Sequence, residues 1–340
     1  LDLVSGKKIA IKAGATVMCA GVWSDQLHEQ FDITPGYNVT MSKGAHIVMP
    51  GSAIKSDAGI IVKTSVSVLF IIPWAGKWIV GTTDTPYEGD RAEPLASKED
   101  VQYILDQANR VLKPKLKAEE IIGVYAGLRP LVANNKSATT TKLSREHTVD
   151  RPVAGFVSIA GGKYTTYRVM AQDVIDRAVI ELRRLTKESV TEKLPLVGAD
   201  GYFALEQQKE RIAQESGLDV ETVTHLLNRH GSLISEILEI IQEQPKLAAK
   251  LDADLPYIKA EIIYAATHEG ALSVDDVISR RTRLSFEATN HAVYLAEDVA
   301  ALIAPVLGWS AKDRKESIAQ YVGLVEREKA ALDQLLEVNS

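Results

Sequence analysis

The stretch "AGGKYTTYR", residues 160–168, follows an apolar run, "GFVSI", and precedes a long helical pattern that begins at "VMAQDVID". A strand that leads into a helix needs only one turn residue and one capping residue. This connection instead supplies two adjacent glycines, Lys163 and two threonines. We therefore expect a buried strand, a polar turn and a helix in succession, which is a unit of mixed α and β folds.

Each part of this turn has a chemical use. Gly161 and Gly162 allow a ligand to touch the backbone because no Cβ keeps it away. The N–H groups at the start of the following helix favour an anion, or a carbonyl oxygen that gains negative charge. Lys163 adds a positive charge, and the hydroxyl groups of Thr165 and Thr166 add hydrogen-bond donors. A tight turn with a capped helix explains the same residues, and the spacing is not that of a phosphate-binding P-loop.

Three other stretches carry candidate functional residues. In "YAGLRPL", Arg129 offers a planar guanidinium that suits phosphate or carboxylate, although a surface ion pair is the commoner role of such a residue. In "SKGAHIVMP", His46 lies in a strand pattern, where it can accept a proton or be an ordinary core residue. In "CAGVWSDQL", Gly21 ends a strand and Trp23 follows it.

The bulk composition is that of an ordinary globular protein. Of 340 residues, 46% are hydrophobic and 25% are charged, and this length predicts two domains. The net charge of -6, without a basic run, argues against a nucleic-acid partner. The single Cys19 fits a reducing, cytoplasmic compartment. No metal-binding motif and no apolar run of about 20 residues occurs, so we expect neither a metal site nor a membrane span.

The domain organisation follows from a change of pattern along the chain. Residues 1–195 alternate strands and helices, whereas residues 196–340 show helical patterns only. In the first domain we expect an N-terminal hairpin around Ser5-Gly6, two strands around Ala75-Gly76, and a polar loop over residues 133–155. We expect the chain to begin inside a longer fold.

Helical segments in both domains allow more detailed expectations. Ser97 and Asp100 resemble a capping box. The helix that they begin carries one apolar stripe, formed by Val101, Ile104, Leu105, Ala108 and Val111. In the second domain, His225 and His230 are expected to be solvated. "SRRTRL", residues 279–284, is expected to be an ion-paired element that faces the first domain.

Together these stretches resemble one family. Its members, the FAD-dependent sn-glycerol-3-phosphate dehydrogenases, contain similar segments in the same order and spacing. The resemblance covers nearly the whole chain and rests on "KGAHIVMP", "IPWAGKWIVGTTDTPYEGD", "YAGLRPL", "LSREHTV", "SIAGGKYTTYRVMAQDVID", "LPLVGADGY" and "HEGALSVDDVISRRTRLSFE". It implies the C-terminal part of a glycine-oxidase-like FAD fold of the α+β/α/β class. A mixed or antiparallel substrate sheet would be followed by an all-helical domain.

The resemblance also implies an activity. Members of the family oxidise sn-glycerol 3-phosphate to dihydroxyacetone phosphate, with hydride transfer to FAD and electron transfer to quinone. It further implies a homodimer that lies peripherally on the inner face of the membrane. Two alternatives remain open, namely a soluble flavin oxidase of the same superfamily, or a non-catalytic fragment that serves assembly or membrane docking.

Residue roles can be carried over by position. Catalysis would use His46 and Arg129, and substrate binding would use Arg129, Lys163 and Thr165. Cofactor binding would use Gly21, Gly127, Leu128, Gly161, Gly162, Lys163, Tyr164 and Thr165. The sequence departs from the family in two respects: Met18 replaces an asparagine, and the G-x-G-x-x-G dinucleotide fingerprint is absent. We therefore expect the isolated chain to be inactive.

Overall fold

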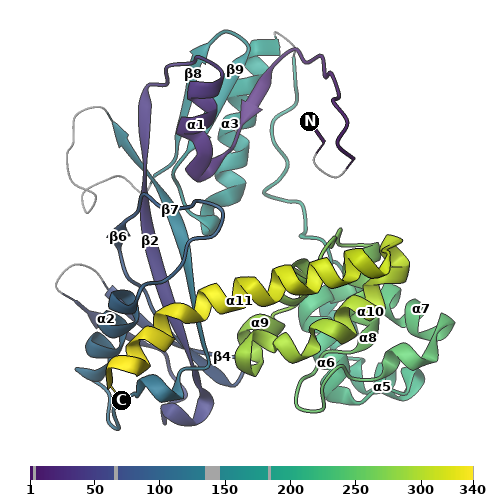
Figure 1. Ribbon diagram of the computed structural model, residues 1–340. Coiled ribbons are helices and arrows are strands. Elements are labelled where there is room, and N and C mark those ends of the chain that lie inside the picture. The colour runs from purple at the N-terminus through teal and green to yellow at the C-terminus, as the bar shows by residue number, and fades with distance from the viewer. Residues whose placement is uncertain (3–4, 65–67, 135–145, 183–184, 340) are drawn as a thin grey trace.

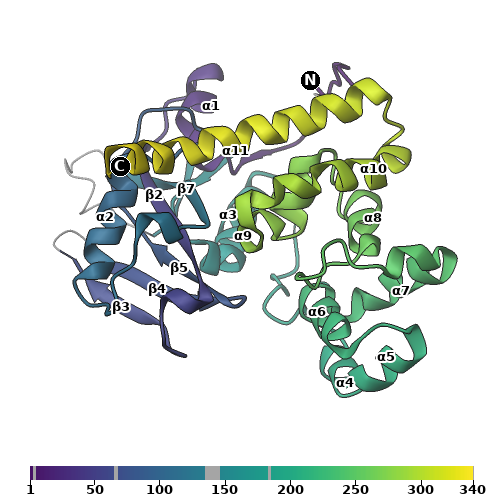
Figure 2. The same cartoon turned by 60° about the horizontal axis from the view of Figure 1, so that its bottom comes forward.

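The computed structural model has a part built on two sheets and a helical part, which one long helix connects (Figure 1). It describes residues 1–2, 5–64, 68–134, 146–182 and 185–339. The long helix, α11 (Ala311–Asn339), runs from the helical part back to the sheets, and the second view shows the same course (Figure 2).

The smaller sheet leads into the stretch at residues 160–168, which joins a strand to a helix. Its strands lie in the order β1 (Thr16–Met18), β9 (Phe156–Ala160) and β8 (Thr148–Val153). β1 and β9 are parallel, and β8 is antiparallel to β9. The helix α3 (Tyr167–Leu182) packs on this sheet through Val174 and Ala178, while the short helix α1 (Ser24–Gln30) follows β1.

The larger sheet is antiparallel and is organised around one long strand. Its strands are β2 (Tyr37–Pro50), β3 (Ile60–Lys63), β4 (Val68–Trp74), β5 (Lys77–Gly81), β6 (Thr85–Pro86) and β7 (Gly123–Asn134). β2 pairs with β5 and β6, and it pairs with β7 from Tyr37 to Val48. β2 and β7 also extend to the smaller sheet (Figure 1), where Tyr37 and Val132 pack against Ala160.

The core of the larger sheet lies on one of its faces. Ala45, Ile47 and Met49 of β2 are completely buried there, against the helix α2 (Lys98–Asn109) and the last turns of α11. The capping box of Ser97 and Asp100 is present, as predicted. The prediction of the apolar stripe was wrong at its last residue. Val111 is exposed and Leu112 is buried instead, because α2 ends at Asn109.

The helical part begins at residue 202. Its helices are α4 (Tyr202–Glu206), α5 (Lys209–Ser216), α6 (Val220–His230), α7 (Ile234–Glu243), α8 (Lys259–Thr267), α9 (Leu284–Glu287), α10 (Ala296–Leu307) and α11. Gly217, Gly231 and Gly308 end α5, α6 and α10 at positive φ, a conformation that glycine adopts without strain. Across the described ranges, no helix is long and apolar enough to cross a membrane.

Two predictions about strands were wrong. In the described residues 1–2 and 5–13, a turn forms at Ser5-Gly6 but no strand flanks it. An isolated two-stranded hairpin is marginal in water, and this segment is exposed. The predicted loop over residues 133–155 contains the strand β8, which is stabilised by pairing with β9. Residues 135–145 of that loop lie outside the described residues.

The prediction that His225 and His230 are solvated was also wrong. Both imidazoles contact the carboxylate of Glu261, at 2.9 and 3.4 Å from its Oε1 atom, and Glu261 is only 2% exposed. Burial opposes the ionisation of Glu261, but hydrogen bonds from the two histidines lower its pKa to about 2. The cluster therefore joins α6 to α8 inside the helical part.

The last turns of α11 belong to the core of the larger sheet rather than to the helical part. Ala331, Leu332 and Leu335 pack there with α2 and β7. The division at residue 195 stays a proposal, with α11 shared between the two parts.

Glu328 on α11 gives a prediction about stability. Burial, together with the carboxylates of Asp275 and Glu93, raises the pKa of Glu328 to about 7. In the unfolded chain this carboxyl group ionises near pH 4.5. Its contribution to the free energy of unfolding therefore becomes unfavourable as the pH rises from 4.5 to 7, and stays unfavourable at higher pH. Glu328→Gln should therefore raise the free energy of unfolding at pH 8, by about 1–3 kcal/mol.

Thermal unfolding at pH 8 and pH 4.5 measures this effect. The variant should melt at a higher temperature than the parent at pH 8 and at a similar temperature at pH 4.5. Glu326→Gln, an exposed position on the same helix, is the matched control and should change neither value. Equal changes at the two pH values would contradict the assignment.

Candidate functional site

One face of the larger sheet collects the polar residues that the sequence singled out. β2 and β7 pair residue by residue, and side chains that lie directly opposite each other point to the same face. The pairs on this face are Ser42 with Arg129, Gly44 with Gly127, and His46 with Tyr125. The alternate residues of β2 point into the core. The structure thus places His46, Gly127 and Arg129 on one face, and the side chain of Leu128 on the opposite one.

The guanidinium of Arg129 is held by the segment that follows β5. Its Nη1 donates to the carbonyl oxygen of Thr83 at 3.2 Å, and its Nη2 donates to Oγ1 of Thr82 at 2.8 Å. The carboxylate of Asp84 lies 3.7 Å from Nη1. A methyl group at Gly44 would stand 2.4 Å from Nη2, so only glycine leaves room for this position of the guanidinium. Arg129 is therefore a fixed positive charge, about a third exposed, above the sheet.

His46 is held between two neighbouring strands. Its ring stacks on Tyr125, with centroids 5.0 Å apart and planes 9° from parallel. On the β5 side it lies over Gly81, where a Cβ would come within 2.4 Å of the ring. Burial, with a smaller contribution from the charge of Arg129, lowers the pKa of His46 to about 4. The imidazole is therefore neutral at pH 7 and can accept a proton.

The sheet has open space above Gly127. No atom of the described residues lies within 4 Å of the position that a Cβ would occupy there, and the residue is exposed. A glycine inside a strand weakens the sheet and often marks a place where a ligand approaches the backbone. Gly127 therefore leaves the backbone of β7 accessible beside Arg129 and His46, whereas the Arg129 guanidinium covers Gly44.

A second group of predicted residues lies at the edge where β1 and β9 end. Because these strands are parallel, their carboxyl ends meet at the same edge, which is the usual ligand position in α/β sheets. Gly21, Gly161 and Gly162 follow these ends, with φ of 55°, 79° and 79°. A Cβ at Gly161 would stand 2.7 Å from a carbonyl oxygen and 2.8 Å from Val132, so the turn packs closely on β7.

The helix start after this turn is both capped and exposed. Oγ1 of Thr166 accepts from the N–H of Lys163 at 3.3 Å and donates to the carbonyl oxygen of Lys163 at 3.0 Å. Lys163, Tyr164 and Thr165 are exposed, and Tyr164 is 92% exposed. The simple explanation, a capped helix, thus holds for Thr166, while the three residues before it remain accessible to a ligand.

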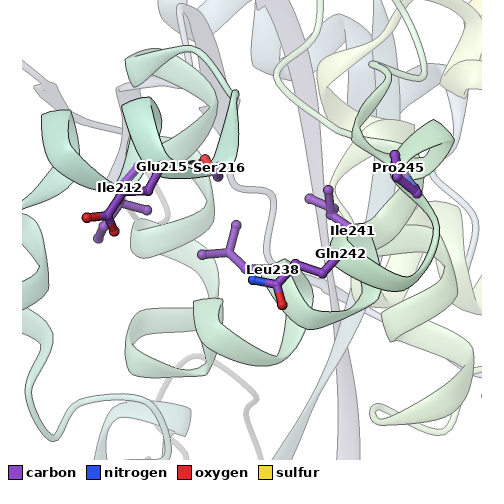
Figure 3. Close-up of a pocket in the computed structure, with 7 residues that line it drawn as sticks. All are labelled: Ile212, Glu215, Ser216, Leu238, Ile241, Gln242 and Pro245. Atoms are coloured by element: carbon purple, nitrogen blue, oxygen red, sulfur yellow. Dashed lines mark hydrogen bonds between the residues drawn. The ribbon is translucent and has the colours of Figure 1, made fainter.

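A pocket in the helical part lies apart from these residues. It has a volume of about 330 Å³ and is lined by Ile212, Glu215, Ser216, Leu238, Ile241, Gln242 and Pro245 (Figure 3). These residues come from α5, α7 and the turn after α7. None of the predicted site residues lines it.

Comparison with known proteins identifies the family. Residues 2–168 match the family model described as FAD dependent oxidoreductase, and residues 189–314 match the C-terminal domain of alpha-glycerophosphate oxidase. A glycerol-3-phosphate dehydrogenase of Mycobacterium leprae is 46% identical over 96% of this chain and 56% of its own length. The chain belongs to the family of FAD-dependent glycerol-3-phosphate dehydrogenases. It spans about half the length of the curated relatives it matches.

More distant relatives agree with this result. The human mitochondrial glycerol-3-phosphate dehydrogenase is 31% identical over 93% of this chain and 44% of its own length. The solved glycerol-3-phosphate dehydrogenase of Bacillus halodurans, complexed with FAD, matches with a TM-score of 0.83 at 26% identity. This match covers 97% of the chain and 66% of the solved one. The predicted fold class and the FAD dependence of the family are therefore confirmed.

Several residues of the candidate site were missed by the sequence analysis. Tyr125, Gly44, Gly81 and Thr82 all lie within quoted motifs, but no function was assigned to them. Their relation to His46 and Arg129 depends on strand register, which only the pairing shows. The alternation of Ser42, Gly44 and His46 along one strand was the available signal.

The electrostatic link between Arg129 and His46 can be tested without a ligand. A nearby positive charge disfavours the protonated imidazole, so Arg129→Ala should raise the pKa of His46 above its value of about 4. An NMR titration of the His46 ring protons measures this change. Arg151→Ala, which removes an arginine paired with Glu181 elsewhere, should leave the titration unchanged. An unaltered midpoint in Arg129→Ala would contradict the link.

Proposed function

We propose that the protein takes part in the oxidation of sn-glycerol 3-phosphate to dihydroxyacetone phosphate, with FAD as the hydride acceptor. The observation that carries this proposal is the sheet face with a fixed Arg129, a neutral His46 and the open Gly127 between them. Family membership supports the choice of substrate. Such a face offers a cation for phosphate, a base for a hydroxyl proton, and a flat backbone against which a ligand can lie.

The chain's residues would divide the chemistry as follows. Arg129 binds negative charge on the substrate with its planar guanidinium, which Thr82 and Thr83 hold in place. The Nδ1 atom of His46 is buried and, within the described part of the chain, has no hydrogen-bond partner. We therefore assign acceptance of the C2 hydroxyl proton to Nε2. A phosphate beside Arg129 offsets its charge and so raises the proton affinity of His46 when substrate is present.

The turn at residues 161–165 fits the cofactor. FAD, when bound, supplies the two-electron acceptor for the hydride from C2. Gly161 and Gly162 form the turn at positive φ and leave room for the protein's own packing rather than for a ligand, while Lys163 with the following helix start favours negative charge. Gly21 at the neighbouring strand end, Tyr164 and Thr165 would complete the contacts. These roles, and those of Gly127 and the Leu128 backbone, stay proposals.

The remaining proposals concern partners. We propose quinone as the electron acceptor, a homodimer as the assembly, and a cytoplasmic location with peripheral attachment to the membrane. They are supported by the family resemblance. A soluble oxidase that uses oxygen and a non-catalytic role in assembly are the alternative outcomes of the experiment.

The experiment that tests the function is anaerobic reduction of the FAD-loaded protein, prepared together with the dinucleotide-binding segment of the family because the isolated chain is expected to be inactive. Glycerol 3-phosphate should bleach the flavin absorbance, whereas glycerol, which lacks the phosphate, should do so far more slowly. Reoxidation by a soluble quinone is then compared with reoxidation by oxygen. Equal rates with the two substrates would reject a glycerol 3-phosphate site, and a protein that retains no flavin would favour the non-catalytic alternative.

Gly127→Ala separates a ligand-binding role from a structural one. The added methyl group meets no atom within 4 Å in the part of the chain that the structure describes, so the melting temperature should stay within about 2 °C. If a ligand lies against this backbone, the same methyl group should lower kcat/KM by at least tenfold. Gly59→Ala, at a glycine away from this face with ordinary contacts of 3.5 Å or more, is the control. Unchanged kcat/KM would remove Gly127 from the site.

Lys163→Met tests the charge at the helix start. This change keeps the length of the side chain but removes its ammonium group. The flavin midpoint potential should fall, because the reduced flavin loses a favourable charge, and KM for glycerol 3-phosphate should rise several-fold. Since Lys163 is exposed, the melting temperature should change little. A lower melting temperature with unchanged potential and KM would assign Lys163 to helix capping alone.

A further inference from the structure

A short helix of the helical part reaches the face that carries His46. The ring of Phe286 in α9 contacts Tyr125 of β7, with centroids 5.1 Å apart and planes at 76°. It also contacts Trp74 of β4, at 6.4 Å and 79°. Edge-to-face pairs at such distances are favourable. Phe286 thus links two strands of the larger sheet to the helical part.

Tyr125 connects this contact to the candidate base. It lies directly opposite His46 in the pairing of β2 with β7, and the two rings are stacked. Phe286 and His46 are therefore both in contact with one tyrosine ring. Movement of Phe286 would free Tyr125 to rotate, and water could then reach the His46 imidazole.

The chain on both sides of Phe286 is firmly held. Arg283 lies over the Trp74 ring at 5.6 Å, and its N–H donates to the hydroxyl of Tyr257 at 3.1 Å. After α9, three successive residues, Asn290 to Ala292, have φ of 50–55°. Such backbone is unfavourable for residues other than glycine and persists only where its surroundings determine it.

The left-handed turn brings a second contact with the sheet. His291 is 3% exposed and its ring would lie 3.7 Å from a Cβ at Gly123, two residues before Tyr125 on the same face. α11 fixes the turn from the other side, since the hydroxyl of Tyr321 donates to the carbonyl oxygen of His291 and Lys329 donates to Asn290 at 2.9 Å. α9 is thus anchored to the sheet by contacts on both sides of Phe286.

We propose that Phe286 is a positioning residue, which acts through Tyr125 to fix the His46 ring and to exclude water from it. The helical part would in this way set the proton affinity of a group on the sheet. The role of His46 as a base rests on the proposed function, but the effect of Phe286 on His46 does not. The sign follows from burial: a solvent-excluded imidazole resists protonation, so opening the site makes it easier to protonate.

Among the residues that the structure describes, two groups that act on His46 come from β7. Arg129 and Tyr125 face it from β7, and Arg129 is itself close to Asp84. α9 itself carries Glu287, next to Phe286, and Arg283 just before α9 lies over the Trp74 ring. Replacement of Phe286 by an apolar residue changes none of these charges. A shift of the His46 titration would therefore report hydration and ring position.

The test compares Phe286→Ala with Phe286→Leu by NMR titration of the His46 ring protons. We expect at least a threefold gain in proton affinity in Phe286→Ala and a smaller gain in Phe286→Leu, which keeps part of the apolar contact. Phe203→Ala removes an 80% exposed phenylalanine of the same helical part and should have no effect. If Phe286→Ala fails to fold, Phe286→Leu alone decides, because any positioning role requires some shift.

Activity gives a second and separable measurement. In the FAD-loaded protein, the acid limb of kcat/KM should move to higher pH in Phe286→Ala by the same factor as the titration. A shifted titration with an unshifted acid limb would reject His46 as the base and leave the positioning role standing. Lower melting temperatures with an unchanged His46 titration in both Phe286 variants would overturn the proposal.

Discussion

The antiparallel pairing of β2 with β7 is the constraint on which the candidate site depends. It sets His46 opposite Tyr125, Gly44 opposite Gly127 and Ser42 opposite Arg129. A slip of one residue would turn all of these side chains into the core. The register is fixed from the other face, where Ala45, Ile47 and Met49 are completely buried, so the packing that stabilises the sheet also positions the polar residues.

The polar face of the larger sheet lowers the stability of the fold, whereas the apolar face raises it. Glycines inside strands weaken a sheet, and a buried imidazole whose Nδ1 has no hydrogen-bond partner among the described residues is unfavourable. Both features lie on the polar face, and the apolar core on the other face offsets them. Gly44 and Gly81 are required there because a Cβ at either position would displace the Arg129 or His46 side chain. The side chains of Arg129 and His46 thus restrict the neighbouring positions 44 and 81 to glycine.

Local signals in the sequence predicted part of this structure. The strands around Ala75-Gly76 and the capping box of Ser97 follow from short-range propensities. Long-range pairings could not be predicted. The strand β8 exists because β9 pairs with it, and the two histidines of α6 contact the buried Glu261 of α8, which lies 36 and 31 residues later in the chain. For the same reason, "SKGAHIVMP" and "YAGLRPL" revealed His46 and Arg129 as candidates but not their shared face.

The helical part holds the larger sheet from both faces. On the core face, the last turns of α11 pack with α2, and on the polar face α9 lies against Trp74 and Tyr125. One such contact would leave the helical part free to pivot about it, whereas two contacts on opposite faces fix its orientation. Because α11 also holds the left-handed turn after α9, the two contacts are mechanically linked. The position of the Phe286 ring beside Tyr125 is therefore set by packing on the far side of the sheet, which makes the stability of the core a condition for the geometry around His46.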